Sequence, residues 1–298
     1  MIGADAMLTA DVFIQALISG LSNGIVYALI AIGFTLVFGV MDIVNFSHGH
    51  KVMLSMFISY FLYQTFKLDP FLSLAVTIPA LFIIGFVLYK LIIRHLVGKP
   101  HSTHIITTIA LFIILENLMN LIFGGDLRGI TTSYSTASIG LGTVAIGVAP
   151  LLAASVTLIV VISLYLFLQK SDFGKAIRAC SQNLRGAQIS GINTKKVYII
   201  AFAISAALAG LAGTVMIPFK MVDPFVGHEF LSKSFAIVVL GGLGSISGAF
   251  IGAILIGIIQ SLSTVLISAS MANAITFALI IAVIIIKPTG LISSAKEG

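Results

Sequence analysis

The sequence predicts an all-α polytopic membrane protein, a transmembrane helical bundle of eight or nine spans, and three observations support this fold class. Only 9% of the 298 residues are charged and 59% are hydrophobic, whereas soluble domains carry about 25% charged residues. Long stretches have no charge, among them Val12–Met41, Val148–Gln169, Val197–Phe219 and Ser234–Ile286. These stretches are continuously apolar, which excludes the alternating pattern of a β-barrel. Lipid offers the backbone no hydrogen-bond partner, so each run of about 20 such residues is expected to cross the bilayer as a helix.

In chain order, spans are expected at residues 12–40, 50–66, 71–89, 105–123, 148–169 and 197–217, with two or three more between 231 and 287. The first uncharged run would extend about 45 Å as a helix, which is more than one hydrocarbon thickness. It is therefore expected to be strongly tilted, or broken near Gly33 or Gly39. The glycine-heavy stretch VVLGGLGSISGAFIGAILIG is either a short full span or a re-entrant segment, which would need protein or a water-filled cavity around it.

Positive charges predict the orientation, because cytoplasmic connections are enriched in Lys and Arg. Two basic connections are separated by two spans and therefore lie on the same side of the membrane. Lys51 falls on that side as well, because an even number of spans separates it from them. The two connections hold Lys90, Arg94, Lys99, Lys170, Lys175, Arg178, Arg185, Lys195 and Lys196. The other side holds Lys67, Arg128, Lys220 and Lys233, offset by Asp5, Asp11, Asp69, Asp126, Asp223 and Glu229. The N-terminus is therefore expected outside. Nine spans would bring Lys287 and Lys296 inside and eight would leave them outside, and the basic tail favours nine.

One polar segment, residues 171–196, interrupts the apolar runs on the cytoplasmic side. Small residues recur there at helical spacing and form one face, made of Ala176, Ala179, Cys180, Asn183 and Ala187. The other face carries Lys175, Arg178, Gln182 and Arg185, and Gly191 ends the helix. A face of small residues suits a helix that docks into a groove of a partner protein. The alternative is an amphipathic helix that rests on lipid headgroups, and the physical argument leaves both open.

Three stretches carry a resemblance to a known family: RACSQNLRGAQISGIN, NGIVYALIAIGFTLVFGVMDIVNFSHGH and KSFAIVVLGGLGSISGAFIGAILIGIIQSL. They are similar, in that order, to the cytoplasmic coupling segment, the first-span signature and the late glycine-rich segment of the Liv permease family, the permeases of branched-chain amino-acid ABC transporters. The resemblance covers nearly the whole chain, a single permease domain of residues 1–298, and the length suits the shorter of the two permeases in such systems. One departure is visible. The family often has an acidic residue after His-Gly, whereas His50 and Lys51 stand here.

The resemblance implies a permease subunit of an ABC importer in the inner membrane of a bacterial cell, which translocates branched-chain or related amino acids by alternating access. The implied partners are a second homologous permease, two cytoplasmic ATPase subunits, and an extracytoplasmic binding protein that meets outer loops at residues 124–147 and 218–233. The ATPases would hydrolyse the ATP, so no cofactor is expected on this chain. The polar segment would dock into an ATPase cleft through Ala176, Arg178, Ala179, Cys180, Arg185, Gly186, Ala187 and Gly191.

Polar residues within or near the spans are candidates for the pathway or its gate, because such groups are costly at membrane depth. Asp42, Asn45 and His48 lie at the inner end of the first span, and Glu116 and Asn120 share one face of the fourth. Structural roles compete with this view. Asp42 would pair with Lys51, Asn45 would cap the second span, and Glu116 with Asn120 would clamp helices together.

Five glycines at G-x-x-x-G spacing are expected to let helix backbones approach closely: Gly20, Gly24, Gly244, Gly248 and Gly252. The alternative is that they line a narrow pathway or let it flex.

Other function classes find no matching motif. The chain has no phosphate-binding G-x-x-x-x-G-K-[ST], no H-E-x-x-H and no G-x-S-x-G, so it is not expected to be an enzyme. Cys180 is the only cysteine, which excludes an intrachain disulfide, and no metal site is expected. The net charge of +6 reflects basic cytoplasmic connections rather than nucleic-acid binding. The rival function is an ion-coupled secondary transporter, or a channel for small polar solutes, in which Glu116 or Asp42 would couple to protons or ions.

Overall fold

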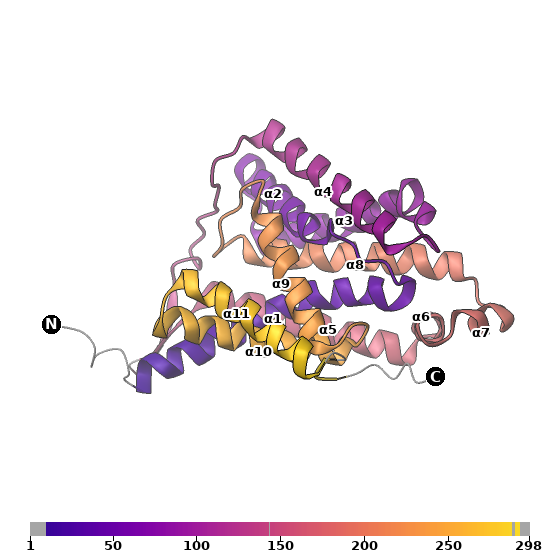
Figure 1. Cartoon of the computed structure of the whole chain (residues 1–298). Coiled ribbons are helices and arrows are strands. Elements are labelled where there is room, and N and C mark those ends of the chain that lie inside the picture. Colours follow the sequence, from indigo (N-terminus) through magenta and orange to yellow (C-terminus); the bar gives the residue numbers. More distant parts are fainter. Residues whose placement is uncertain (1–9, 143, 288–289, 293–298) are drawn as a thin grey trace.

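The computed structural model describes residues 10–142, 144–287 and 290–292 and forms one helical bundle (Figure 1). Asp5 and Lys296, two of the charges on which the predicted orientation rests, lie outside these residues. The longer helices are α1 (Ala10–Met41), α2 (His48–Phe66), α3 (Pro70–Leu91), α4 (His101–Phe123), α5 (Val148–Lys170), α8 (Thr194–Met216), α9 (Val226–Gly241), α10 (Ile246–Leu266) and α11 (Ala269–Ile286). The shorter elements are η2 (Ile93–His95), α6 (Asp172–Gln182), α7 (Leu184–Ile189), and the antiparallel strands β1 (Ser138–Leu141) and β2 (Val144–Gly147).

The helical membrane bundle predicted from composition is confirmed. Seven of the described helices are long and apolar enough to cross a membrane, and α2 and α9 are not among them. The first turn of α2 contains His48, His50 and Lys51, and α9 has only 16 residues. The count of eight or nine spans therefore stays a prediction.

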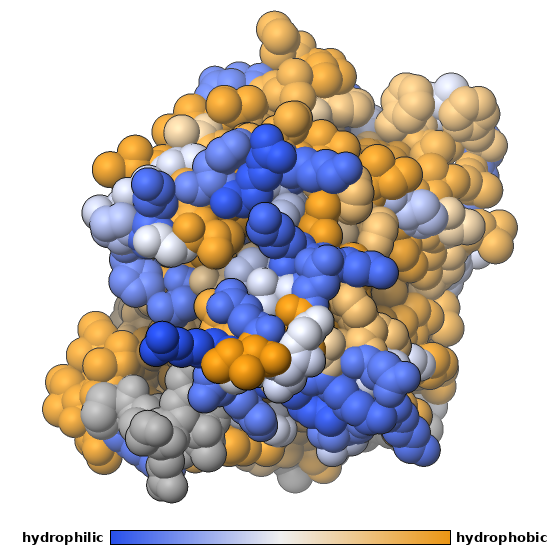
Figure 2. Space-filling view, turned by 90° about the vertical axis from the view of Figure 1, so that its right-hand side faces the viewer, coloured by the Kyte–Doolittle hydropathy of each residue, from blue (hydrophilic) through white to orange (hydrophobic). Residues whose placement is uncertain are grey.

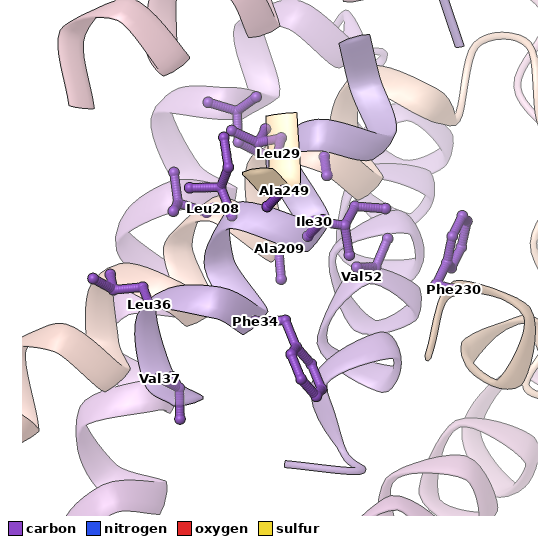
Figure 3. Packing of buried hydrophobic residues seen from close by; sticks show 14 of the residues in the cluster. Leu29, Ile30, Phe34, Leu36, Val37, Val52, Leu208, Ala209, Phe230 and Ala249 are labelled. Atoms are coloured by element: carbon purple, nitrogen blue, oxygen red, sulfur yellow. The ribbon is translucent and has the colours of Figure 1, made fainter. Parts of the chain in front are cut away.

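The centre of the bundle is formed by α1 and α8 (Figure 1). α10 packs along α1, and α3 packs along α8. Figure 3 shows the buried α1 side chain Leu29 close to Leu208 of α8 and Ala249 of α10. Phe34 of α1, also buried, packs edge-on against the rings of His48 and Phe235. Every residue from Val26 to Val37 is buried, so this part of α1 is covered on all sides. A helix buried all round is expected to be apolar all round, which explains the uniform composition of the first run.

Glycine contacts let the central helices approach at backbone distance. A Cβ atom on Gly257 of α10 would lie 2.5 Å from the Cα of Gly24 in α1, and one on Gly20 would lie 2.7 Å from the Cα of Ile258. Where α9 crosses α10, a Cβ on Gly248 would overlap the carbonyl group of Gly241. Nothing larger than a hydrogen fits at such crossings.

Gly252 and Gly244 differ in their surroundings. A Cβ on Gly252 would lie 2.8 Å from the carbonyl oxygen of Ile237, so this glycine also lies at the α9–α10 crossing. Gly244 is in no helix. It lies in the turn between α9 and α10 with φ +84°, a left-handed conformation that favours glycine. The predicted helix-packing step at Gly244 is therefore wrong.

The backbone is continuous in one predicted place of a break and broken where none was predicted. α1 is one uninterrupted helix of 32 residues, so of the two alternatives for the first run, strong tilt or a break near Gly33 or Gly39, the break is excluded. The polar segment, predicted as one helix, is broken at Asn183 into α6 and α7. The Asn183 side chain accepts a hydrogen bond from the amide of Gly186 and caps α7. Asn is a preferred capping residue, and its presence inside the polar segment was a signal for this break.

Candidate functional site

The chain turns back into the bundle between α1 and α2. α1 ends at Met41, yet His48 at the start of α2 donates from Nε2 to the carbonyl of Ile30, in the middle region of α1, over 2.9 Å. Within the connection, Asn45 Oδ1 accepts from the amide and the hydroxyl of Ser47, at 3.1 and 2.7 Å. These three polar residues are buried. α2 therefore begins deep in the bundle, where protein covers its irregular approach, as membrane depth requires. Asn45 holds the connection, and the N-cap residue of α2 is Ser47.

Asp42 and Lys51 do not form the predicted pair. The Asp42 side chain is 61% exposed and lies 3.8 Å from His101, at the start of α4. Lys51 is fully buried, with its Nζ 4.1 Å from the centre of the Phe202 ring. In the described part of the chain, Lys51 Nζ has no hydrogen-bond partner. The Phe202 ring stabilises its charge instead, because a cation is attracted to the face of an aromatic ring. The pairing was wrong because the chain turn carries Lys51 into the bundle and leaves Asp42 at its end.

Glu116 points from α4 towards two histidines on other helices. Its Oε2 lies 2.7 Å from Nε2 of His228 in α9 and 3.4 Å from Nε2 of His50 in α2. The His50 ring stacks on Phe112, with centroids 4.8 Å apart, and meets the His228 ring edge-on at 5.1 Å. Asn120, one helical turn further along α4, is exposed. The cluster therefore unites Glu116 with two histidines that were not among the site residues predicted from the sequence.

A cavity of about 270 Å³ lies between α9, α10 and α11, beside this cluster. Charged groups form one wall. Glu229 Oε1 accepts hydrogen bonds from Lys220 and Lys233, each at 2.6 Å, and Lys233 also donates to the Tyr27 hydroxyl at 2.9 Å. The lining residues are His228, Glu229, Ser232, Lys233, Ala236, Ile256, Gln260, Asn273, Thr276 and Phe277. The cavity thus combines a paired cation and anion with amides, hydroxyls and apolar surface.

The charged wall was missed because Glu229 and Lys233 were counted among outer-loop charges. Both belong to helix α9, and Lys233 is only 9% exposed. A signal was present. A Glu followed four residues later by a Lys, directly before a long uncharged run, fits an i, i+4 pair on one helix face.

The polar segment presents a different face from the predicted one. Cys180 and Ala187 are each 4% exposed and pack against the chain's own core, and this burial raises the pKa of the Cys180 thiol. Ala176, Arg178, Ala179 and Gly186 are half-buried, whereas Arg185 and Gly191 are exposed. Two apolar side chains are exposed on α7, Leu184 at 40% and Ile189 at 82%. The stripe of small residues therefore faces inward in part, and α7 forms the outer surface.

Figure 2 looks onto the end of the molecule where α6 and α7 lie, and hydrophilic residues gather there between hydrophobic flanks. A second cavity, of about 290 Å³, lies under α6. Its lining includes Arg178 and Ser181 of α6, Gly39 of α1, and Gly244 and Ser245 in the α9–α10 turn. Asp42 lines a neighbouring pocket with Cys180. The two basic connections, one next to His101 and one in α6–α7, therefore share the end of the bundle where α1 finishes.

These features define the class of the molecule: a multi-pass helical membrane protein with charged and polar side chains around a cavity between α9, α10 and α11 and a polar helical segment at one end. Residues 16–284 match the family described as branched-chain amino acid transport system, permease component. The chain belongs to this family. It is a transport permease component and not an enzyme.

Several relatives are similar over almost the full length. The high-affinity branched-chain amino acid transport system permease proteins LivH of Escherichia coli K12 and BraD of Pseudomonas aeruginosa are each 30% identical, over 94% of this chain and 95% of their own. The ribose import permease protein RbsC of Haemophilus influenzae is 28% identical over 96% of this chain and 89% of its own. No solved structure matches.

Proposed function

We propose that the chain is the membrane-spanning permease subunit of an ATP-driven importer of branched-chain or related amino acids in the inner membrane of a bacterial cell. The match to the permease family over residues 16–284, with LivH and BraD as full-length relatives, carries this proposal. It favours ATP-driven import over the ion-coupled transporter or channel. Because RbsC is also a relative, the family alone leaves the substrate open between amino acids and sugars.

The chemistry of the α9–α11 cavity supports an amino-acid substrate. A zwitterion needs a cation for its carboxylate and an anion for its ammonium group, and Lys233 and Glu229 line the cavity side by side. Both lysines bond the same oxygen, Glu229 Oε1, so Oε2 is available to an ammonium group. Ile256 and Phe277 offer apolar surface to an aliphatic side chain. The specificity of such pockets depends on a small number of precisely placed polar groups. For ribose, which is uncharged, these groups would be neutral donors and acceptors and not a pair of opposite charges.

Nine membrane segments with the N-terminus outside fit the arrangement of the helices, and we assign α2 and α9 as partial crossings. α2 starts at the level of Ile30 and α9 starts beside His50, so each begins deep in the bundle. The amide of Leu291 bonds the carbonyl of Leu240, which returns the chain after α11 to the end where α9 finishes. α9 would then be a broken crossing, entered through the irregular stretch before Val226, and α10 after the glycine turn would be a full span and not a re-entrant segment.

Docking of an ATPase is assigned to α7, with Leu184 and Ile189 as its apolar anchors and Arg185 as its charge partner. The buried residues Cys180 and Ala187 would fasten the segment to the bundle instead of contacting the ATPase. A displacement of α7 would be transmitted to α6 and, across the cavity beneath α6, to the α9–α10 turn. A second permease, two ATPase subunits and an extracytoplasmic binding protein complete the proposed assembly. Asp42, Asn45 and His48 would then hold the inner gate closed or open.

Uptake in cells distinguishes the proposal from its rival. Cells that lack this chain would be complemented with the wild-type gene, and uptake of labelled leucine and ribose would be measured after ATP depletion or after collapse of the proton gradient at preserved ATP. We expect leucine uptake that is lost on ATP depletion and persists without the gradient. Uptake that follows the gradient and ignores ATP supports the secondary transporter, and uptake of ribose alone refutes the assignment of the substrate.

A further inference from the structure

We propose that His50, Glu116 and His228 form a Zn²⁺ site that joins α2, α4 and α9. The three side chains come from three helices, and their ligand atoms all lie within 4.8 Å of one another. Histidine nitrogens with one carboxylate oxygen are a common ligand set for zinc. No such site was expected from the sequence, because the three residues are far apart in the chain and no short motif contains them.

The spacing of the ligand atoms suits a small tetrahedral ion. Zn²⁺ binds nitrogen and oxygen at about 2.0–2.2 Å, so neighbouring tetrahedral ligand atoms lie roughly 3.3–3.6 Å apart. His50 Nε2 and Glu116 Oε2 are 3.4 Å apart. His228 Nε2 is 2.7 Å from the same oxygen, so this ring must withdraw slightly when the ion enters. The His228 side chain is 48% exposed and has room to do so, whereas Phe112 holds the His50 ring in place.

An independent observation points to a ligand at His50. Its side chain is fully buried, and neither of its ring nitrogens has a hydrogen-bond partner in the described part of the chain. Buried polar groups are normally satisfied, and an exception calls for an explanation such as a bound ion. Gly227 makes the space for this ring, because a Cβ there would lie 2.6 Å from His50 Cδ2. The local packing thus holds an unsatisfied imidazole next to two further ligands.

The donor set selects the kind of metal. Ca²⁺ and Mg²⁺ prefer oxygen ligands, whereas imidazole suits zinc and neighbouring transition metals. Three protein ligands leave one coordination position open for water or another ligand. Because His228 also lines the α9–α11 cavity, a bound ion would hold the start of α9, next to Glu229 and its lysines, against α4. Metal occupancy would thereby control the position of the charged wall.

The test measures zinc binding in the full-length protein, purified in mild detergent with its co-purifying partners and with an affinity tag free of histidine. Zinc content is determined by mass spectrometry of the metal after equilibration with Zn²⁺ and gel filtration, and Co²⁺ is substituted to read the coordination geometry from its visible spectrum. The variants are His50→Ala, His228→Ala and Glu116→Gln. The matched control is His95→Ala, which removes a histidine from η2 at another place in the fold.

We expect about one zinc per chain in the wild type and in His95→Ala, with the intense Co²⁺ absorption of four-coordinate sites. Loss of a supporting contact to a metal ligand costs 10–100-fold in affinity, so loss of a ligand should cost at least about 100-fold. Zn²⁺ should raise the thermal midpoint of the wild type and leave that of the conservative Glu116→Gln variant unchanged. Wild-type protein that is monodisperse and binds no zinc overturns the proposal. Zinc retained by the three variants, or lost equally in His95→Ala, overturns it as well, because binding would then be adventitious.

Discussion

A methyl group at Gly257 should separate the two helices that contact each other most extensively, α1 and α10. The new Cβ would lie 2.5 Å from the Cα and 2.6 Å from the amide nitrogen of Gly24. Carbon atoms pack at about 3.5–4.0 Å, so α10 must move by about 1 Å. Both surfaces are backbone, and no side-chain rotation can relieve the contact. Overpacking typically costs about 1–3 kcal/mol, and we expect Gly257→Ala to lie at the upper end, about 3 kcal/mol.

The free energy of unfolding would be measured by denaturant titration in mild detergent micelles, with circular dichroism as the readout. The matched control is Gly140→Ala in β1, where an added Cβ meets nothing within 4 Å. Its effect should stay within about 0.5 kcal/mol, as for other surface substitutions. Equal stabilities of Gly257→Ala and Gly140→Ala would refute the backbone-distance packing of α1 against α10.

Three further predictions follow from individual side chains. Cys180 should react slowly with a maleimide at neutral pH in folded protein and fast after unfolding, because it is 4% exposed and its thiol pKa is raised. The control, Ser190→Cys in a Cys180→Ala background, should react fast in folded protein. Equal rates for the two cysteines would contradict the packing of α6. Glu229→Gln removes the counter-charge of two lysines, one of them only 9% exposed. It should cost about 1–3 kcal/mol of stability, given that the carboxylate is 38% exposed. It should also abolish leucine uptake, and normal uptake would exclude this carboxylate from the substrate site. Ile189→Arg should change the free energy of unfolding by no more than about 0.5 kcal/mol, because the side chain is 82% exposed. Uptake and co-purification of the ATPase should nevertheless be lost. An ATPase that still binds would exclude α7 as the docking surface.

The long helices were predictable because their cause is local. A run of about 20 uncharged apolar residues has one stable form in lipid, so α3, α4, α5 and α8 lie close to their expected positions. The sequence left undecided whether two or three helices follow residue 226, because glycines permit both a continuous helix and a turn. The φ of +84° at Gly244 decides for a turn, and only tertiary packing against Gly39 reveals why it lies there.

The sites were less predictable because they depend on which helices meet. Glu116 was recognised as an intramembrane carboxylate, but its partners His50 and His228 come from helices whose order of packing no pattern in the sequence specifies. Lys51 shows the same limit. Charge counting assigned it to a cytoplasmic connection, whereas the turn between α1 and α2 buries it completely.

The most direct test of the central claim is co-purification in gentle detergent from the native membrane, with the associated chains identified and counted by mass. The account predicts two ATPase subunits and a second permease, and a complex that takes up leucine into liposomes only with ATP and the binding protein. A chain that purifies alone and transports in liposomes without ATP would contradict it.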